Sequence, residues 1–246
     1  MQFRFRSQTY SLAFRTGFFL FILPFIILCL LLGDWQLHRY QYKKNLLLTY
    51  QQRLASPAKI FSQITEPLTH LQFQPITAKG YYVNKLTMLV QNKFYKDQIG
   101  FEVLTPMRIA SEKKLLLVDR GWIKALDNRL APTIDKVTNE QHIKGYIKLL
   151  NEYQFTLGEN ILNSSSFPII MQKIDINEIS HITKQFFYPF IVRLDATQTN
   201  GFIRDWNIIS VLPQRHMAYA VQWFIMAITL VIAFLFFCCQ RINERE

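Results

Sequence analysis

The chain has 246 residues, 50% of them hydrophobic, and carries a formal net charge of +11 at pH 7. This balance is typical of a membrane protein with one extramembrane domain. All three cysteines, Cys29, Cys238 and Cys239, lie in or beside two long apolar runs. Their placement excludes disulfide frameworks, CxxC redox motifs, thiolate metal sites and c-type haem attachment from the rest of the chain.

The first apolar run covers residues 16–33, between Arg15 and Asp34, with Pro24 in its middle. A helix of this length crosses the hydrocarbon core of a bilayer. The run is too long for the hydrophobic part of a signal peptide, and no small-x-small cleavage site separates it from the polar residues that follow. We therefore predict an uncleaved transmembrane helix over residues 16–33.

Helical spacing continues beyond this anchor. Leu47, Tyr50 and Leu54 recur at intervals of three and four residues, and no glycine or proline interrupts the chain between the anchor and Pro57. The pattern predicts that the anchor continues as an amphipathic helix, which Pro57 ends. At its polar start Trp35 and Arg39 lie one turn apart, so we expect their side chains to stack, whereas we interpret His38 as an interfacial bystander.

From residue 73 the chain consists of short runs rich in β-branched and aromatic residues, separated by turn-like pairs such as Lys96-Asp97. These runs predict strands, and the short turns predict an antiparallel meander. The predicted strands cover residues 73–83, 86–94, 99–109, 114–123, 139–150, 152–162, 167–174 and 187–194. A short helix over residues 176–184 and the amphipathic piece before Ser56 are expected to cover one face. The predicted fold is two transmembrane α-helices flanking an α+β extramembrane domain dominated by antiparallel β-sheet.

A second apolar run, residues 217–239, has 23 residues without a formal charge, so its helix is about 34 Å long at 1.5 Å per residue. Two spans put both termini on one side of the membrane. Arginines before the first span, with no acid among them, predict that residues 1–15 and the tail 240–246 are cytoplasmic. Residues 34–215 then form a domain in the periplasm of a bacterium or the intermembrane space of a mitochondrion.

The segment before the first span is very short for a mitochondrial transit peptide. We therefore predict a bacterial inner membrane protein with its large domain in the periplasm. An exported domain is not expected to bind nucleic acid. Its excess of cations either contacts anionic lipid or an acidic partner, or represents scattered solubilising lysines.

The entrance of the second span carries polar and aromatic residues on one face. At 100° per residue they fall within about a third of the helix circumference. These residues are His216, Tyr219, Gln222, Trp223 and Met226. One interpretation is an interfacial belt, in which aromatic rings lie among the lipid headgroups. The working hypothesis is a binding face, because imidazole is a common metal ligand and an intramembrane glutamine usually faces protein or a cavity.

Enzyme motifs are missing from the predicted domain. His70, His142 and His181 show no HxxxH or HxH spacing, and neither a GxSxG turn nor a glycine-rich phosphate loop occurs. Copper delivery is disfavoured because the domain lacks thiols. The sequence predicts a non-enzymatic protein, with an envelope enzyme whose site is assembled from distant residues as an alternative.

Five blocks follow one another along the chain. They are Gly33-x-Trp35-Gln36-x-x-Arg39, Gly100-Phe101-Glu102-Val103-Leu104-Thr105-Pro106, Leu117-Val118-Asp119-Arg120-Gly121-Trp122-Ile123, Arg204-x-Trp206 and Pro213-x-Arg215-His216-x-x-Tyr219-Ala220-x-Gln222-Trp223-Phe224. In this order they resemble the signatures of the surfeit locus protein one family, which consists of assembly factors for cytochrome c oxidase. The chain departs from the family pattern at Tyr42, where a second tryptophan is usual, and at Lys124, where a proline often stands.

The resemblance implies a role in maturing the haem-containing oxidase subunit, by receiving or holding haem a. The family's histidine at the start of the second span, proposed to contact haem, falls on His216. The expected transient haem a site comprises His216 as iron ligand, Tyr219, Gln222 and Trp223 as pocket walls, and Arg39 or Arg215 at the propionates. The expected partners are oxidase subunits, the haem a biogenesis machinery and membrane lipid. In the alternative, the polar face packs against an oxidase helix without haem.

The blocks in the domain also have structural explanations. We interpret Arg120-Gly121-Trp122 as a tight turn after a buried strand, with its arginine hydrogen-bonded to carbonyls or paired with Asp119 or Glu102. Gly100, like the glycine of that block, is expected to give backbone freedom at a turn. Thr105-Pro106 is expected to end or edge a strand. Direct contact with a partner is the alternative.

Overall fold

The computed structural model describes residues 2–5, 8–12, 16–64, 66–126, 130–150 and 168–242. The chain divides into two compact units, Met1–Leu48 with Asn207–Glu246, and Thr49–Trp206. The first unit contains the two apolar helices, and the second is a sheet-rich domain. Each unit is described by itself.

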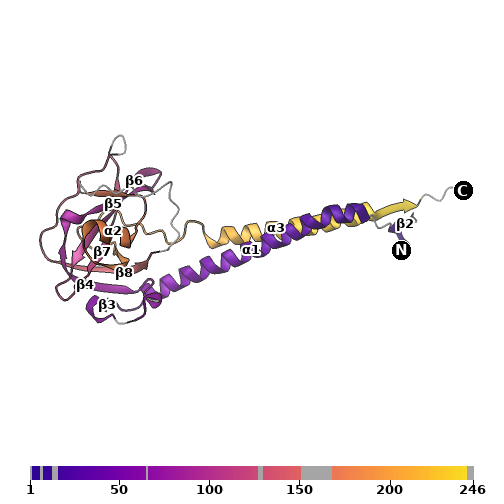
Figure 1. The fold of residues 1–246 in the computed structure, drawn as a ribbon. Coiled ribbons are helices and arrows are strands. Elements are labelled where there is room, and N and C mark those ends of the chain that lie inside the picture. The colour runs from indigo at the N-terminus through magenta and orange to yellow at the C-terminus, as the bar shows by residue number, and fades with distance from the viewer. Residues whose placement is uncertain are drawn as a thin grey trace. The chain divides into compact units, whose positions relative to one another are not determined.

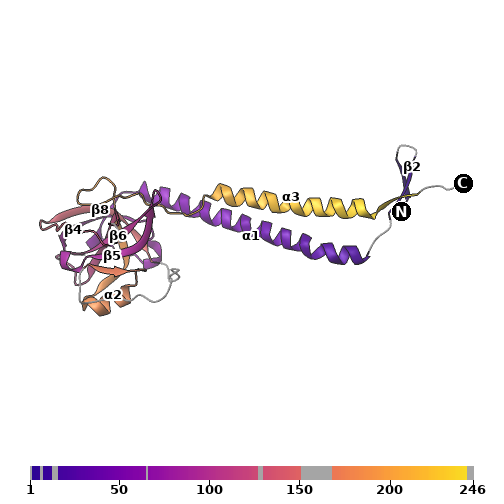
Figure 2. The same cartoon turned by 90° about the horizontal axis from the view of Figure 1, so that it is seen from above.

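Two long helices, α1 (Thr16–Leu54) and α3 (Pro213–Cys238), dominate the first unit and lie side by side (Figures 1 and 2). Phe18 near the start of α1 stacks on Phe234 near the end of α3, with ring centroids 6.0 Å apart, so the helices are antiparallel. Both are long and apolar enough to cross a membrane. Large apolar side chains cover their outer surfaces, as at Phe21 and Phe236, which are 66% and 80% exposed. Such surfaces suit lipid, and the protein is a membrane protein.

Small side chains line the seam between α1 and α3. Buried positions repeat at seven-residue intervals at Ile22 and Cys29 on α1 and at Pro213, Ala220 and Ala227 on α3, and Gly33 and Cys238 are buried as well. This interval is typical of helix pairs that pack with a slight left-handed twist. Gly33 is a point of close approach, because a Cβ atom there would lie 2.7 Å from the Phe224 ring. The second helix begins at Pro213, four residues before the predicted span, since proline is well suited to the first turn.

Next to the two helices, three short strands form an antiparallel sheet in the described part of the first unit. They are β1 (Gln2–Phe5), β2 (Gln8–Leu12) and β11 (Cys239–Ile242), in the order β1-β2-β11. The backbones of the two terminal segments therefore pair with each other, a feature that the sequence analysis did not predict.

Within the described part of Thr49–Trp206, eight strands form one sheet in the order β3-β4-β8-β10-β7-β6-β5-β9. The strands are β3 (Lys59–Ile60), β4 (Pro75–Tyr82), β5 (Met88–Tyr95), β6 (Gln98–Arg108), β7 (Leu115–Lys124), β8 (Gln141–Leu149), β9 (Ile169–Met171) and β10 (Phe187–Leu194). The 3₁₀ helices are η1 (Phe61–Gln63), η2 (Leu68–His70) and η3 (Asn84–Leu86). An additional pairing of β4 with β6 closes β4, β8, β10, β7 and β6 into a barrel-like ring. The predicted fold class is confirmed.

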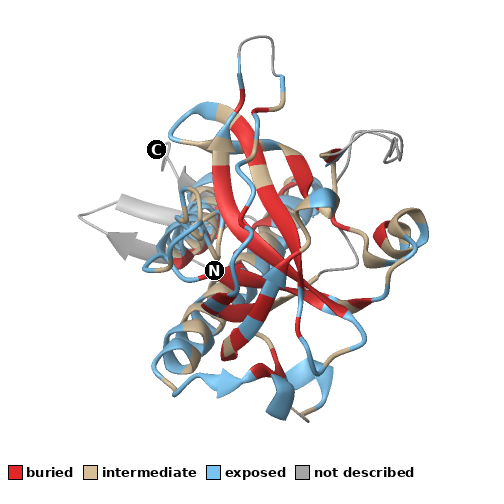
Figure 3. Ribbon diagram, turned by 90° about the vertical axis from the view of Figure 1, so that its left-hand side faces the viewer, coloured by how far each residue is buried: buried red, intermediate tan, exposed pale blue. Residues whose placement is uncertain are grey.

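Buried residues concentrate on the barrel strands (Figure 3). On β7, Leu116 and Val118 join one buried cluster while Leu115 and Leu117 join another. Alternate residues of a strand point to opposite faces, so β7 is buried on both sides. The second cluster is covered by α2 (Ile176–Thr183), whose Ile179 is 2% exposed. This helix confirms the predicted one.

An aspartate begins α2. The Asp175 carboxylate accepts hydrogen bonds from the backbone N–H groups of Asn177 and Glu178, at 3.0 and 3.2 Å, and thereby satisfies donors that the first turn leaves free.

The continuation of α1 to Leu54 is also confirmed, but this helix covers less of the domain than predicted. Tyr50 packs its ring 5.1 Å from that of Phe73, whereas Leu54 is 42% exposed.

The predicted meander is correct only for β5, β6 and β7. Strand β4 pairs with β8 and β6 and not with β5, while β3, β9 and β10 make parallel pairs with β4, β5 and β7. Strand β4 pairs with β6 because β6 is long enough to serve two partners: it pairs with β5 up to Leu104 and with β4 from Met107. The strand predicted at residues 152–162 lies outside the described residues.

Pro106 lies inside β6, so the predicted strand end at Thr105-Pro106 is wrong. Its carbonyl accepts a hydrogen bond from Val83 N at 2.8 Å. In a strand the N–H and C=O groups of one residue point to the same side. At Pro106, which has no N–H, that side faces the gap in β6 between its pairing with β5, which ends at Leu104, and its pairing with β4, which begins at Met107. A central strand tolerates proline there because no ladder bond is lost.

Candidate functional site

His216 lies in the seam of the helix pair, where its Nδ1 is 2.8 Å from Gln36 Oε1. The amide oxygen can only accept a hydrogen bond, so this contact fits an imidazole whose Nδ1 is the donor. A neutral imidazole with its proton on Nδ1 keeps a lone pair on Nε2, the form that ligates a metal. The two residues are 180 positions apart in the chain, and the sequence analysis missed Gln36 as a partner.

The structure divides the predicted polar face. His216 and Trp223 are half-buried, whereas Tyr219, Gln222 and Met226 are exposed on the flank of α3. Tyr219 is 53% exposed. Consequently only part of the predicted set lies toward α1, and the remainder is open to a partner or to lipid.

Both arginines of the predicted set, Arg39 and Arg215, are exposed. The Arg39 guanidinium lies 5.8 Å from the centroid of the Trp35 ring, which confirms the predicted stack. His38 bonds within its own helix, with Nδ1 3.0 Å from the Asp34 carbonyl oxygen. Exposed guanidinium groups can meet carboxylates or phosphates, because they present several donors in a planar fork.

In the domain, two distant blocks of the sequence meet. The segment of residues 198–206, which we call the strap, lies along β7. Trp122 N donates to Ile203 O at 2.7 Å, Ile203 N donates to Trp122 O at 3.0 Å, and Phe202 N donates to Arg120 O at 2.8 Å. These bonds join the Arg-Gly-Trp block of β7 to the segment that contains Arg204 and Trp206.

Arg120 of β7 holds the strap through contacts with Asn200 and Phe202. It is 2% exposed, its Nε donates to Asn200 O at 2.8 Å, and its guanidinium lies 5.1 and 5.0 Å from the rings of Tyr82 and Phe202. The predicted bond to a carbonyl is confirmed, but the ion pairs predicted for Arg120 are made by Arg193 instead.

The predicted turn at Arg120-Gly121-Trp122 is wrong, because β7 continues through all three residues. Gly121 forms an irregularity within the strand, with φ at +115°. Gly100 lies in β6 and not at a turn; a Cβ atom there would be 2.6 Å from the Trp122 indole. The close approach of neighbouring atoms therefore explains both glycines. At Gly121 the positive φ is a second reason for glycine.

A cluster of buried charges, which we call the Arg193 cluster, lies beside the strap. Arg193 Nε is 3.6 Å from Asp119 Oδ2, and Arg193 Nη2 is 3.8 Å from Glu102 Oε1. Lys93 Nζ lies 3.3 Å from Glu102 Oε2. The Arg193 guanidinium stacks 4.5 Å from the centroid of the Trp206 ring, and the Trp206 indole N–H donates to Leu194 O at 3.0 Å.

Burial raises the pKa of the Asp119 carboxyl to about 7; the charge of Glu102 adds to the rise and that of Arg193 opposes it. Burial lowers the pKa of Lys148 to about 8, with Arg193 as the next cause. The sequence analysis missed this cluster. Its available signal was a single charge within an apolar strand, as at Asp119 after Leu115–Val118 and at Arg193 after Phe190–Val192.

Comparison with known proteins decides the family. A profile described as SURF1 family matches residues 23–228. The chain belongs to this family. Similar proteins include the SURF1-like proteins of Rickettsia bellii, 25% identical over 221 residues and covering 87% of each chain, and of Monosiga brevicollis, 21% identical over 214 residues and covering 82% of this chain and 80% of that protein. Surfeit locus protein 1 of Gallus gallus is 21% identical over 225 residues, covering 83% of this chain and 69% of that protein.

The SURF1 family is broadly one of cytochrome oxidase assembly factors. The five blocks that suggested it fall in this structure on the helix pair, on β6, and on the contacts between β7 and the strap. Among the described residues, no group of three or more His, Cys, Asp or Glu side chains is arranged to hold a metal ion.

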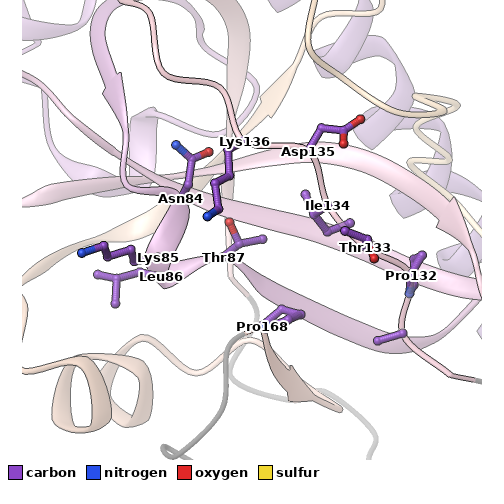
Figure 4. Close-up of a pocket in the computed structure, with 11 residues that line it drawn as sticks. Asn84, Lys85, Leu86, Thr87, Pro132, Thr133, Ile134, Asp135, Lys136 and Pro168 are labelled. Carbon is purple, nitrogen blue, oxygen red and sulfur yellow. The ribbon is translucent and has the colours of Figure 1, made fainter.

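This SURF1 family member also has a cavity of about 790 Å³ in its domain (Figure 4). Asn84 fixes one wall, because its side chain donates to Val137 O at 2.8 Å and accepts from Val137 N at 3.0 Å. The lining residues are Asn84, Lys85, Leu86, Thr87, Ala131, Pro132, Thr133, Ile134, Asp135, Lys136 and Pro168. None of them belongs to the five blocks, so the cavity is separate from the residues that carry the resemblance.

The raised pKa of Asp119 predicts a pH-dependent stability of this SURF1 domain. Asp119 ionises near its ordinary value of 3.8 in the unfolded chain and near 7 in the folded domain, so between these values the folded state binds the additional proton. The free energy of unfolding therefore falls as the pH rises from about 4 to about 7, by at most about 4 kcal/mol. In Asp119→Asn this slope should flatten in thermal unfolding of the full-length protein.

The matched control is Asp205→Asn, because Asp205 is exposed and should leave the slope unchanged. An Asp119→Asn protein with the wild-type pH dependence would show that another group causes it.

Proposed function

We propose that this protein is a membrane-anchored, non-enzymatic assembly factor for cytochrome c oxidase that holds haem a beside the immature haem-bearing subunit and stabilises that subunit. The observation that carries the proposal is the hydrogen bond between His216 Nδ1 and Gln36 Oε1. With Nδ1 engaged in this contact, Nε2 is the ring nitrogen that would ligate the iron.

The remaining residues of the proposed site suit the parts of haem a. Arg39 and Arg215 are exposed cations, and charge-assisted hydrogen bonds to propionates are the strong kind. Trp223 is half-buried near the seam, and Tyr219 and Gln222 are exposed on the same helix, where they would line the edge of the macrocycle. When bound, the haem supplies the iron, and this chain supplies one imidazole and the propionate contacts.

The charge near the anchors supports the proposed topology. Three arginines, Arg4, Arg6 and Arg15, precede α1 with no acid among them, which by the positive-inside rule favours a cytoplasmic N-terminus. The proposal therefore puts the barrel domain in the periplasm of a bacterial inner membrane. There it would lie on the same side as the entrance of α3 and the residues that meet haem a.

A second candidate function removes haem and keeps the assembly role. Gln222 is exposed on α3, six residues beyond His216, and an intramembrane amide that faces lipid is costly. A helix of an oxidase subunit that packs against this flank would satisfy the amide with an interhelical hydrogen bond. In this case Tyr219 and Gln222 form the contact and His216 acts only within the helix pair.

Cells that express single variants distinguish the two candidates. With His216→Ala we expect the oxidase subunit still to co-purify with the protein, while the haem a content of the membranes falls. With Gln222→Leu we expect the oxidase subunit still to co-purify if the first candidate is correct and co-purification to be lost if the second is correct. A wild-type haem a content in His216→Ala membranes would overturn the haem role.

A further inference from the structure

Gln36 is not among the residues proposed to touch haem a, yet its side chain lies in hydrogen-bond contact with His216. It lies on α1, half-buried, and its Oε1 atom is 2.8 Å from His216 Nδ1. Since a side-chain amide oxygen accepts and does not donate, this contact selects one of the two neutral forms of the imidazole.

His38 on α1 makes its contacts within its own helix. Its Nδ1 lies 3.0 Å from the Asp34 carbonyl oxygen, four residues earlier on the same helix, and 3.2 Å from Asp34 Oδ2. His216 reaches across to α1 and bonds to a side chain. The orientation of its ring is therefore set by the neighbouring helix and not by its own.

The seam holds the two helices close enough for this bond. A Cβ atom on Gly33 would lie 2.7 Å from the Phe224 ring, and Ala220, one turn after His216, is fully buried. Gly33 lies three residues from Gln36 and Ala220 four residues from His216, so the helices pack closely beside this pair. The bond thus belongs to a packed interface and not to two free side chains.

We propose that Gln36 is a positioning residue: it holds His216 with its proton on Nδ1 and directs the lone pair of Nε2 toward an incoming ligand. The tautomer is a property of the unliganded protein, and only the consequence for haem a rests on the function proposed above. Removal of the group that hydrogen-bonds to the other ring nitrogen of a ligating histidine typically lowers metal affinity by about 10-fold to 100-fold.

The first experiment needs no ligand. ¹⁵N-histidine NMR of the full-length protein in micelles reports which ring nitrogen carries the proton, and the His216→Ala spectrum assigns the signal among the five histidines. We expect the Nδ1–H form in the wild type and in Gln36→Glu, which keeps an acceptor. We expect a shift toward the Nε2–H form in Gln36→Leu, which has none.

The control is Gln41→Leu, at an exposed position of the same helix, which should retain the Nδ1–H form. The positioning role is overturned if the wild type shows the Nε2–H form or if Gln36→Leu leaves the spectrum unchanged. Retention of the signal in Gln36→Glu shows that the helix pair tolerates substitution at this position, so a change in Gln36→Leu reports loss of the acceptor.

The second experiment titrates haem a into the same variants. We expect affinity to fall about 10-fold in Gln36→Leu and further in His216→Ala. If His216→Ala binds haem a as the wild type does while Gln36→Leu changes the tautomer, the proposed function fails and the positioning role stands. If His216→Ala loses binding while Gln36→Leu keeps both affinity and tautomer, the positioning role fails and the proposed function stands.

Discussion

Gly121→Val is expected to detach the strap from β7 and to destabilise the domain by about 3 kcal/mol or more. A valine at φ of +115° is strained by about 1–3 kcal/mol. Its Cβ atom would also lie 2.6 Å from Ile203 O, so the backbone pairing between Trp122 and Ile203 cannot persist. Loss of that pairing exposes the ring contact between Arg120 and Phe202 to water.

Thermal unfolding of the full-length protein measures the loss of stability, and amide hydrogen exchange localises it. The amides of Phe202 and Ile203, which bond to β7 at 2.8 and 3.0 Å, should exchange faster in the variant. Gly17→Val is the matched control, because a Cβ atom at Gly17 meets nothing within 4 Å. Unchanged exchange at the strap in Gly121→Val would refute the close contact described here.

Above pH 7, where Asp119 is ionised, Arg193→Ala is expected to cost about 3–5 kcal/mol, because removal of one partner leaves a buried carboxylate without its counter-ion. Arg193 is 7% exposed and faces both Asp119 and Glu102. For a domain of this size a loss of that order lowers the midpoint of thermal unfolding by about 10 °C. The control is Arg108→Ala, whose side chain is exposed and bonds to Gln185; it should change stability by about 0.5 kcal/mol or less.

A double-mutant cycle then tests whether Arg193 acts through Asp119. Asp119→Asn removes the buried negative charge, so it should be less destabilising, or more stabilising, in the Arg193→Ala background than in the wild type, with a coupling of about 1 kcal/mol or more. Strictly additive changes would mean that the 3.6 Å contact between the two side chains carries no interaction energy.

Helices and most strand positions could be predicted because their signals are local. The apolar period of α1 continues to Leu54, and the strand predicted at residues 187–194 coincides with β10 (Phe187–Leu194). The order of the strands could not be predicted in this way. Pairing of β4 with β6 depends on the length of β6 and on a contact between distant segments, and no short stretch of sequence contains that information.

The site shows the same limit. The angular positions of His216 and Gln222 on α3 follow from 100° per residue, but which of them meets α1 depends on how two helices pack. The Gln36–His216 bond joins residues 180 positions apart. Asp119 and Arg193 each interrupt an apolar strand, which is a detectable local signal, yet their proximity follows from the parallel pairing of β7 with β10.

The glycine motifs mark special backbone positions, and Gly121 uses the predicted backbone freedom, but the predicted turns are wrong. Gly121 and Gly100 were assigned to turns because glycine is common there. In the structure both lie inside strands, where Gly121 adopts a positive φ beneath the strap and Gly100 makes room for the Trp122 indole. A sequence motif therefore indicated that backbone or ring atoms approach closely, but not which atoms.

The most direct test of the central claim, that His216 at the entrance of α3 ligates haem a, is a spectroscopic titration of purified full-length protein. Haem a added to the wild type should give a Soret band shifted from that of free haem. His216→Ala should lose this shift, while Gln41→Leu, at an exposed position outside the proposed site, should keep it. Identical Soret spectra and identical haem a recovery for the wild type and His216→Ala would contradict the claim.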